Sequence, residues 1–142
     1  MSDEMWNLRS SLRDLLSTQS SLPKDWRLSF LQRLLGGGTS LLLAAAPPTA
    51  PALWRLWWWC QALVSFGSDF VAVGRTCAIH PLDRCMAAVS CLLVLCMRPG
   101  PYAFAAFFAW YLGRRSRSRE TPRLYAWLHG LWHVLGALAA HI

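Results

Sequence analysis

The chain has 142 residues, a length that suits a single domain. Hydrophobic residues make up 55% of it and charged residues only 15%, whereas about a quarter of an average soluble domain is charged. The net charge of +7 comes from short basic clusters between apolar runs, as in the loops of membrane proteins. This distribution argues against a nucleic-acid partner and favours an all-α integral membrane protein surrounded by membrane lipids.

Residues 1–28 are expected to form an amphipathic, cytosolic N-terminal segment. Apolar residues recur there at helical spacing with charged residues between them, which is typical of a helix lying on a membrane surface; they are Met5, Leu8, Leu12, Leu15 and Leu16. The segment lacks the basic region and the apolar stretch of a cleaved signal peptide. The five cysteines of the chain are odd in number and form no CxxC pair, so we expect no disulfides.

Residues 29–142 are expected to form a bundle of about five transmembrane helices. Breaks such as "PPTAP", "RPGP" and "GRRSRSRE" separate five apolar runs, which are Phe30–Ala46, Ala52–Gly74, Leu82–Met97, Tyr102–Leu112 and Arg123–Ile142. The first and fourth runs are short, because spanning a bilayer takes roughly 20 helical residues. Thr121 and Pro122 have the residue types preferred at the start of a helix, so the last helix should begin there.

Loop charge predicts the orientation of these helices. The basic cluster at residues 114–119 is expected on the cytosolic side, and counting back places the N-terminus there as well. Most polar residues with metal-binding or acid–base chemistry then fall in the cytosolic half of the bundle; they are Asp69, His80, Asp83, His129 and His133. Only His141 is placed on the opposite side, as an interfacial or terminal residue.

The stretch "YAWLHGLWHVLGALAAHI" carries a histidine pair with metal-binding spacing. His129 and His133 are four residues apart and therefore share one helix face. Zinc accepts imidazole and carboxylate ligands, and Asp69, an acid that is costly inside a membrane unless paired, is a candidate third ligand. Asp83 could hold or deprotonate a water, and Ser65 could bond to a substrate oxygen. The sequence thus predicts two histidine ligands of a zinc site, with Asp69 as the candidate for the third.

Structural roles for the same residues stay open. Each histidine of a membrane helix can bond to a carbonyl group of a neighbouring helix. Asp69 can pair with Arg75, and Asp83 can be an acid favoured by the helix dipole at the start of its helix. His80, which precedes a proline, can be an ordinary loop residue, and Ser65 can serve helix packing.

"HGLWHVLGA" resembles the last-helix motif of the CREST superfamily of membrane hydrolases. This superfamily includes the alkaline ceramidases and the progestin and adipoQ receptors. Its pattern has a serine followed four residues later by a histidine, an aspartate that opens the next helix, and the HxxxH pair, which Ser65, Asp83, His129 and His133 match. The chain departs from this pattern at Asp69, where the superfamily has histidine, and in having about five helices where members usually have seven.

The resemblance implies zinc and the hydrolysis of a lipid amide or ester. In that hypothesis Asp69, His129 and His133 bind the metal, with His80 as a further candidate ligand, while Asp83 orients the water and Ser65 assists the substrate. The alternative is a non-enzymatic scaffold, subunit or assembly factor, as a homo- or hetero-oligomer, whose buried histidines and acids maintain packing. A proton or ion pathway is a third, weaker hypothesis.

Overall fold

The computed structural model describes residues 12–20, 28–118 and 121–142, and within them every regular element is helical. In chain order the elements are α2 (Phe30–Gly36), the 3-10 helix η1 (Gly38–Ala44), α3 (Ala52–Phe66), the π-helix η2 (Gly67–Val71), α4 (Ile79–Met97), α5 (Pro101–Ser118) and α6 (Pro122–His141). The described part contains no strand, only an isolated bridge between Gln19 and Thr76. The all-α prediction is confirmed.

The first predicted span is divided into two short helices. Ser29 begins α2 with a capping box, in which its side chain and that of Gln32 each bond to the other's backbone amide. The consecutive glycines 36–38 follow at once, and glycine weakens a helix interior by about 1 kcal/mol relative to alanine. The backbone tightens there into η1, so residues 30–44 form one kinked rod in place of one straight helix.

A π-helical turn ends the second predicted span. The α-helix α3 stops at Phe66, and η2 continues the chain as a wider turn to Val71. Gly37 lies directly against this turn, since a β-carbon on Gly37 would come within 2.5 Å of the Asp69 carbonyl. The glycine junction of α2 and η1 therefore packs backbone to backbone on the turn that carries Asp69.

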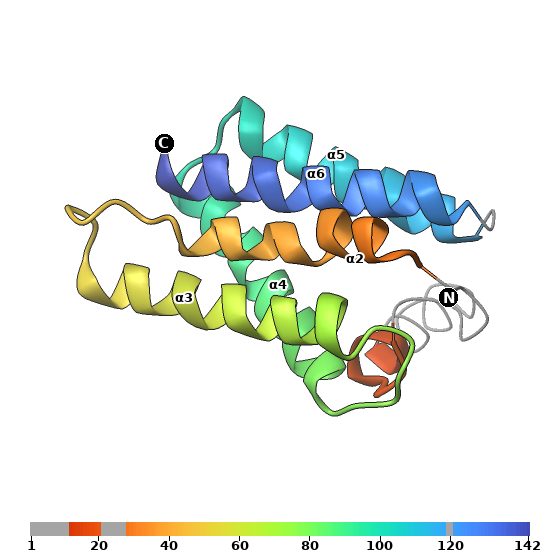
Figure 1. Ribbon diagram of the computed structural model, residues 1–142. Coiled ribbons are helices and arrows are strands. Elements are labelled where there is room, and N and C mark those ends of the chain that lie inside the picture. The colour runs from red at the N-terminus through yellow and green to blue at the C-terminus, as the bar shows by residue number, and fades with distance from the viewer. Residues whose placement is uncertain (1–11, 21–27, 119–120) are drawn as a thin grey trace, which may run out of the picture.

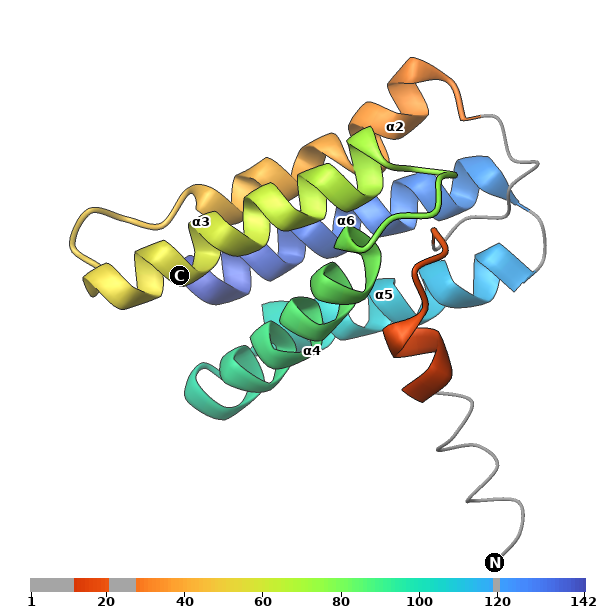
Figure 2. The same ribbon diagram turned by 90° about the horizontal axis from the view of Figure 1, so that it is seen from below.

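Successive helices run in alternating directions through the molecule. Figure 1 shows α2–η1 lying between α6 and α3, with α5 beside α6, and α4 crossing behind. Turned by 90°, the molecule has α4 and α5 on one side (Figure 2). Gly130 of α6 touches α2, because a β-carbon there would lie 2.2 Å from the carbonyl oxygen of Leu35. Gly36 likewise faces Ala126, so small residues allow α2 and α6 to approach closely.

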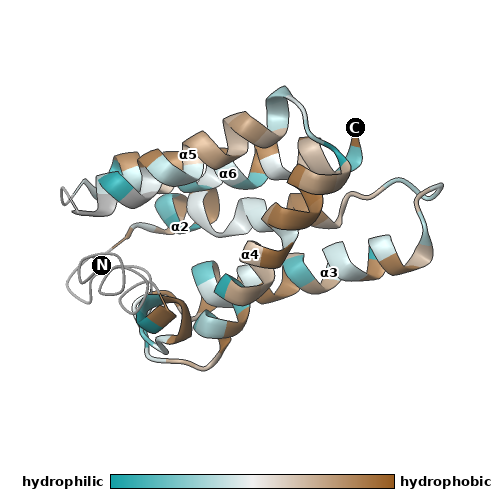
Figure 3. Ribbon diagram, turned by 180° about the vertical axis from the view of Figure 1, so that it is seen from behind, coloured by the Kyte–Doolittle hydropathy of each residue, from teal (hydrophilic) through white to brown (hydrophobic). Residues whose placement is uncertain are grey.

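The bundle interior is rich in alanine and polar residues around a few large side chains such as Trp58 and Leu43, and many large apolar side chains lie outside. The buried hydrophobic residues are mostly alanines, and the buried polar ones include Gln61, Ser65, Ser68, Asp83 and His133. Leucines, phenylalanines and tryptophans are exposed along α2 to α6, for example Leu53, Phe104 and Trp127. Viewed from behind, most of α4 is hydrophobic (Figure 3). The number of exposed large apolar side chains is unusually high for a chain of this size.

One helix of the described residues, Ile79–Met97, is long and apolar enough to cross a membrane by itself. It contains the third predicted span and begins earlier, so His80 belongs to a helix and not to a loop. Helix α5 also extends beyond its prediction, through the basic cluster to Ser118. Helix α6 begins at Pro122 as predicted, although Thr121 makes no side-chain capping bond.

The N-terminal segment is described only in part. Residues 12–16 are helical, whereas residues 1–11 and 21–27, on which much of the amphipathic prediction rests, lie outside the described residues. Arg84 of α4 holds this short helix, donating hydrogen bonds to the carbonyls of Asp14, Ser17 and Gln19. All five cysteines are free thiols, as predicted.

Candidate functional site

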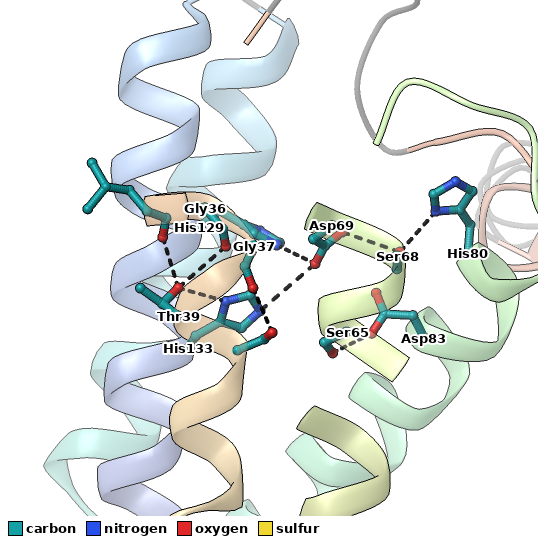
Figure 4. A network of polar contacts seen from close by, with 12 residues as sticks. Gly36, Gly37, Thr39, Ser65, Ser68, Asp69, His80, Asp83, His129 and His133 are labelled. Atoms are coloured by element: carbon teal, nitrogen blue, oxygen red, sulfur yellow. Dashed lines mark hydrogen bonds and ion pairs between the residues drawn. The ribbon is translucent and has the colours of Figure 1, made fainter. Parts of the chain in front are cut away.

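Asp69, His129 and His133 meet between η2 and α6. The Asp69 carboxylate oxygen Oδ2 lies 2.8 Å from Nε2 of His129 and 3.9 Å from Nε2 of His133. Ligand atoms of the three side chains all lie within 4.8 Å of one another, and the group could hold a metal ion. Figure 4 shows Asp69 facing both rings across the interface. The predicted convergence of the HxxxH pair with Asp69 is therefore present.

The separations suit a small metal ion. Bonds of about 2.1 Å in tetrahedral directions place ligand atoms about 3.4 Å apart. The two distances from Asp69 fall on either side of that value, 2.8 Å and 3.9 Å, so side-chain shifts of about 0.5 Å would match it. The His129 Nε2–H donates to Asp69, and this proton would have to leave for a cation to bind.

Thr39 fixes the orientation and the tautomer of His133. The Thr39 hydroxyl donates its proton to the Leu35 carbonyl at 2.8 Å, so its oxygen accepts from Nδ1–H of His133 at 3.2 Å. With the proton on Nδ1, the Nε2 lone pair of His133 faces Asp69. Bonds of this kind behind a ligand raise its basicity and set its orientation. The break at glycines 36–38 matters here because η1 carries Thr39.

Replacing Thr39 with valine is expected to weaken metal binding by about 10- to 100-fold, because His133 loses the hydroxyl that bonds to its Nδ1. Competition of the purified protein with a chromophoric zinc chelator measures the dissociation constant. Thr39→Ser keeps the hydroxyl and is the matched control, expected to bind like the parent chain. Equal affinities of the valine and serine variants would contradict this role of Thr39.

Ser65 and Asp83 form a second buried group, between α3 and α4. The Ser65 hydroxyl donates to Oδ1 of Asp83, and the Gln61 amide donates to the same oxygen at 3.4 Å. The chain of bonds continues from Gln61 to Ser90 at 3.0 Å and from Ser90 to Trp57 at 2.9 Å. Figure 4 shows Asp83 beside Ser65 and Ser68.

The structure does not bring His80 to the metal-ligand group. Its Nε2 bonds to the Arg75 carbonyl at 2.9 Å and its Nδ1 bonds to the Ser68 hydroxyl at 2.9 Å, so both ring nitrogens are engaged. His80 therefore touches the site through Ser68, whose hydroxyl also lies 3.3 Å from Asp69 Oδ1. Ser68 was not among the residues predicted to form the site. Its position directly before Asp69 is the signal that could have identified it.

Two further expectations concern the surroundings of the site. Asp69 was a candidate partner of Arg75, but its ion pairs are with His129 and His133, and Arg75 is exposed. His141 lies at the other end of α6, where its Nε2 bonds to the Leu43 carbonyl at 2.8 Å. His141 is thus remote from the candidate metal ligands, as expected.

A small pocket opens beside the ligands. Its lining includes Asp69, His129, Tyr125, Gln32 and Arg33. The Tyr125 ring stacks on His129 with a centroid distance of 5.2 Å, which holds the imidazole in place. Comparisons with protein-family models, curated proteins and solved structures give no match. The functional conclusion therefore depends on the geometry of this site.

Proposed function

We propose that the chain is a multi-pass membrane protein. The observation that supports this proposal is the exposure of large apolar side chains along α2 to α6, around an interior rich in alanine and polar side chains. Lipid can cover such an apolar surface, whereas water would make it a source of aggregation. Small residues at the contacts between α2 and α6 fit the packing of membrane helices. Helices that are too short to cross the membrane by themselves would then be accommodated by packing against neighbouring helices and by residues at the membrane interface.

We further propose that the chain is a zinc-dependent hydrolase of a lipid amide or ester, similar to the CREST superfamily. The convergence of Asp69, His129 and His133 carries this proposal. The donor set of two imidazoles and one carboxylate is one that catalytic zinc sites use. When bound, zinc would supply Lewis-acid activation of a water molecule and of a carbonyl group.

Asp83 is proposed as the general base. Ser65 and Gln61 both donate to its Oδ1, which fixes the carboxylate that would accept a proton from water. The water oxygen bonds to the carbonyl carbon, the carbon–nitrogen or carbon–oxygen bond breaks, and the proton passes from Asp83 to the leaving amine or alcohol. Ser65 acts as a positioning residue, because its hydroxyl proton is directed at Asp83.

Chelation of the reconstituted protein tests this proposal. The chain is expected to stay in membranes washed with alkaline carbonate and, after reconstitution in liposomes, to release fatty acid from a lipid ester or amide. Removing metal with a chelator should abolish the release, and adding zinc should restore it, while magnesium should not. Extraction by carbonate would contradict the membrane proposal. Release that is absent at full zinc occupancy, or unchanged by chelation, would contradict the hydrolase.

A non-enzymatic scaffold or assembly factor is the second candidate. It is favoured by the observation that the polar groups are already bonded to each other, His129 to Asp69, Ser65 to Asp83 and Ser68 to His80. Such networks also hold membrane helices together. A zinc-loaded protein that hydrolyses none of the lipids offered would support this candidate.

A further inference from the structure

Arg33 is a cation beside the candidate metal ligands that the hydrolase proposal has not used. It lies in α2 one turn before the glycine break and lines the pocket together with Asp69 and His129. The side chain is partly buried. A cation at this place affects any substrate that reaches the metal ligands.

The orientation of Arg33 is fixed by η2. Its Nε–H donates to the carbonyl oxygen of Phe70 at 3.2 Å, and Nη2 donates to the same oxygen. The guanidinium also lies over the Phe70 ring, 5.2 Å from the centroid. These contacts involve one edge and one face of the guanidinium plane, so further N–H groups remain available on the other edge. The side chain is pre-oriented and retains donors for a ligand.

Arg33 has no counter-ion within the described part of the chain. The acid that lines the same pocket, Asp69, is paired with His129 and His133. A partly buried charge without a partner is unfavourable, and an anion arriving with the substrate would remove this cost. With a divalent metal on Asp69, the pocket as a whole becomes positive, which strengthens the preference for an anion.

We propose that Arg33 binds the phosphate of the substrate, so that the lipid hydrolysed is a phospholipid and not a neutral ceramide or acylglycerol. This inference rests on the proposed hydrolase function and names its substrate class. Arginine suits phosphate because the guanidinium presents two parallel N–H groups to two oxygens. The phosphate at Arg33 would then bring the rest of the lipid to the pocket that Asp69 and His129 also line.

Binding of short-chain lipids to the zinc-loaded, detergent-purified full chain tests this assignment without any need for turnover. The probes are dihexanoyl phosphatidate, dihexanoyl glycerol and inorganic phosphate, and the readout is the dissociation constant from thermal-shift titrations. Phosphatidate is expected to bind about 10-fold or more tighter than the neutral lipid. This factor corresponds to the binding free energy of a pair of charge-assisted hydrogen bonds. Arg33→Gln should remove this preference, and Arg33→Lys should retain part of it.

Arg75→Gln is the matched control, because it removes the same charge from an exposed side chain close in sequence to η2 and keeps the backbone carbonyl that His80 uses. It should leave the preference unchanged. Equal binding of phosphatidate and neutral lipid by the parent chain would overturn the assignment even if Arg33→Gln fails to fold. Inorganic phosphate binding as tightly as phosphatidate would also overturn it, as a free-anion site. Retained preference without any hydrolysis would instead contradict the proposed hydrolase alone.

Discussion

A chain carrying His133→Ala is expected to lose its zinc, falling from about one ion per protein to none. His133 would supply one of three ligands and is almost fully buried, so no other side chain can take its place. Loss of one neutral ligand from a three-residue site removes both a bond and the geometry for the remaining two. The metal content of the purified protein, measured by inductively coupled plasma mass spectrometry, gives the result directly.

His141→Ala is the control for this experiment, since His141 lies on the same helix and bonds to the Leu43 carbonyl at the far end. It should keep about one zinc per chain. A second variant, Asp69→His, places an imidazole where the CREST pattern has one and is expected to retain zinc. Equal and negligible zinc in the parent chain and in His133→Ala would refute the metal site, and the three residues would then be a structural ion-paired cluster.

The histidine pair was the most predictable part of the site, for a geometric reason. Helical periodicity alone places His129 and His133 on one face of α6. The cost of an unpaired acid inside an apolar run then indicated that Asp69 needs a partner. The two arguments concern different helices. Neither could predict that Asp69 and the histidine pair come together in the folded chain.

The local geometry around Asp69 could not be predicted from the sequence. A continuous α-helix would put Ser65 and Asp69 on one face, four residues apart. The π-turn Gly67–Val71 changes this relation, because Ser65 bonds to Asp83 of α4 whereas Asp69 turns to α6. Gly37 allows the backbone contact that accompanies the turn. A π-turn depends on such packing and has little signature in local sequence.

The role of Thr39 was missed for a related reason. Residues 30–46 have the composition of one apolar helix that the central glycines destabilise. The break at glycines 36–38 makes the following residues a separate 3-10 helix, η1. This helix brings Thr39 to His133, 94 residues away in sequence. Apolar content predicted that this segment packs in the bundle, but the identity of its contacts depends on the close approach of α2 and α6 at Gly130.

Hydropathy alone also gave an incomplete view of the helices. It predicted five spans, and one helix of the described part satisfies length and apolarity together. Helices α2 and α3 are shortened by the glycine break and by the π-turn. Helices α5 and α6 are long enough, but α5 ends in arginines and α6 contains three histidines, which lower the mean hydropathy. Hydropathy averaged over a stretch of sequence cannot distinguish a polar residue that faces a neighbouring helix from one that faces lipid.

An Asp83→Asn chain is expected to keep its zinc and lose hydrolysis by about 100- to 10,000-fold, the usual contribution of a general base. Asparagine has the same shape, and its Oδ1 still accepts from Ser65 and Gln61, so the helix contact survives. Because both hydrogen bonds to Oδ1 remain, the melting temperature should not fall. Fatty-acid release from liposomes and metal content, measured on one preparation, separate the two effects.

Ser90→Ala is the matched control for Asp83→Asn. It removes a buried hydroxyl from the same chain of hydrogen bonds, between Gln61 and Trp57, but no acid or base. Hydrolysis should survive this change even if stability falls by about 1 kcal/mol. If Asp83→Asn hydrolyses lipid as fast as the parent chain, Asp83 is not the base and its buried carboxylate serves packing alone. If both variants lose activity in proportion to their loss of stability, the network acts by holding α3 against α4, which is the role that the scaffold hypothesis assigns to it.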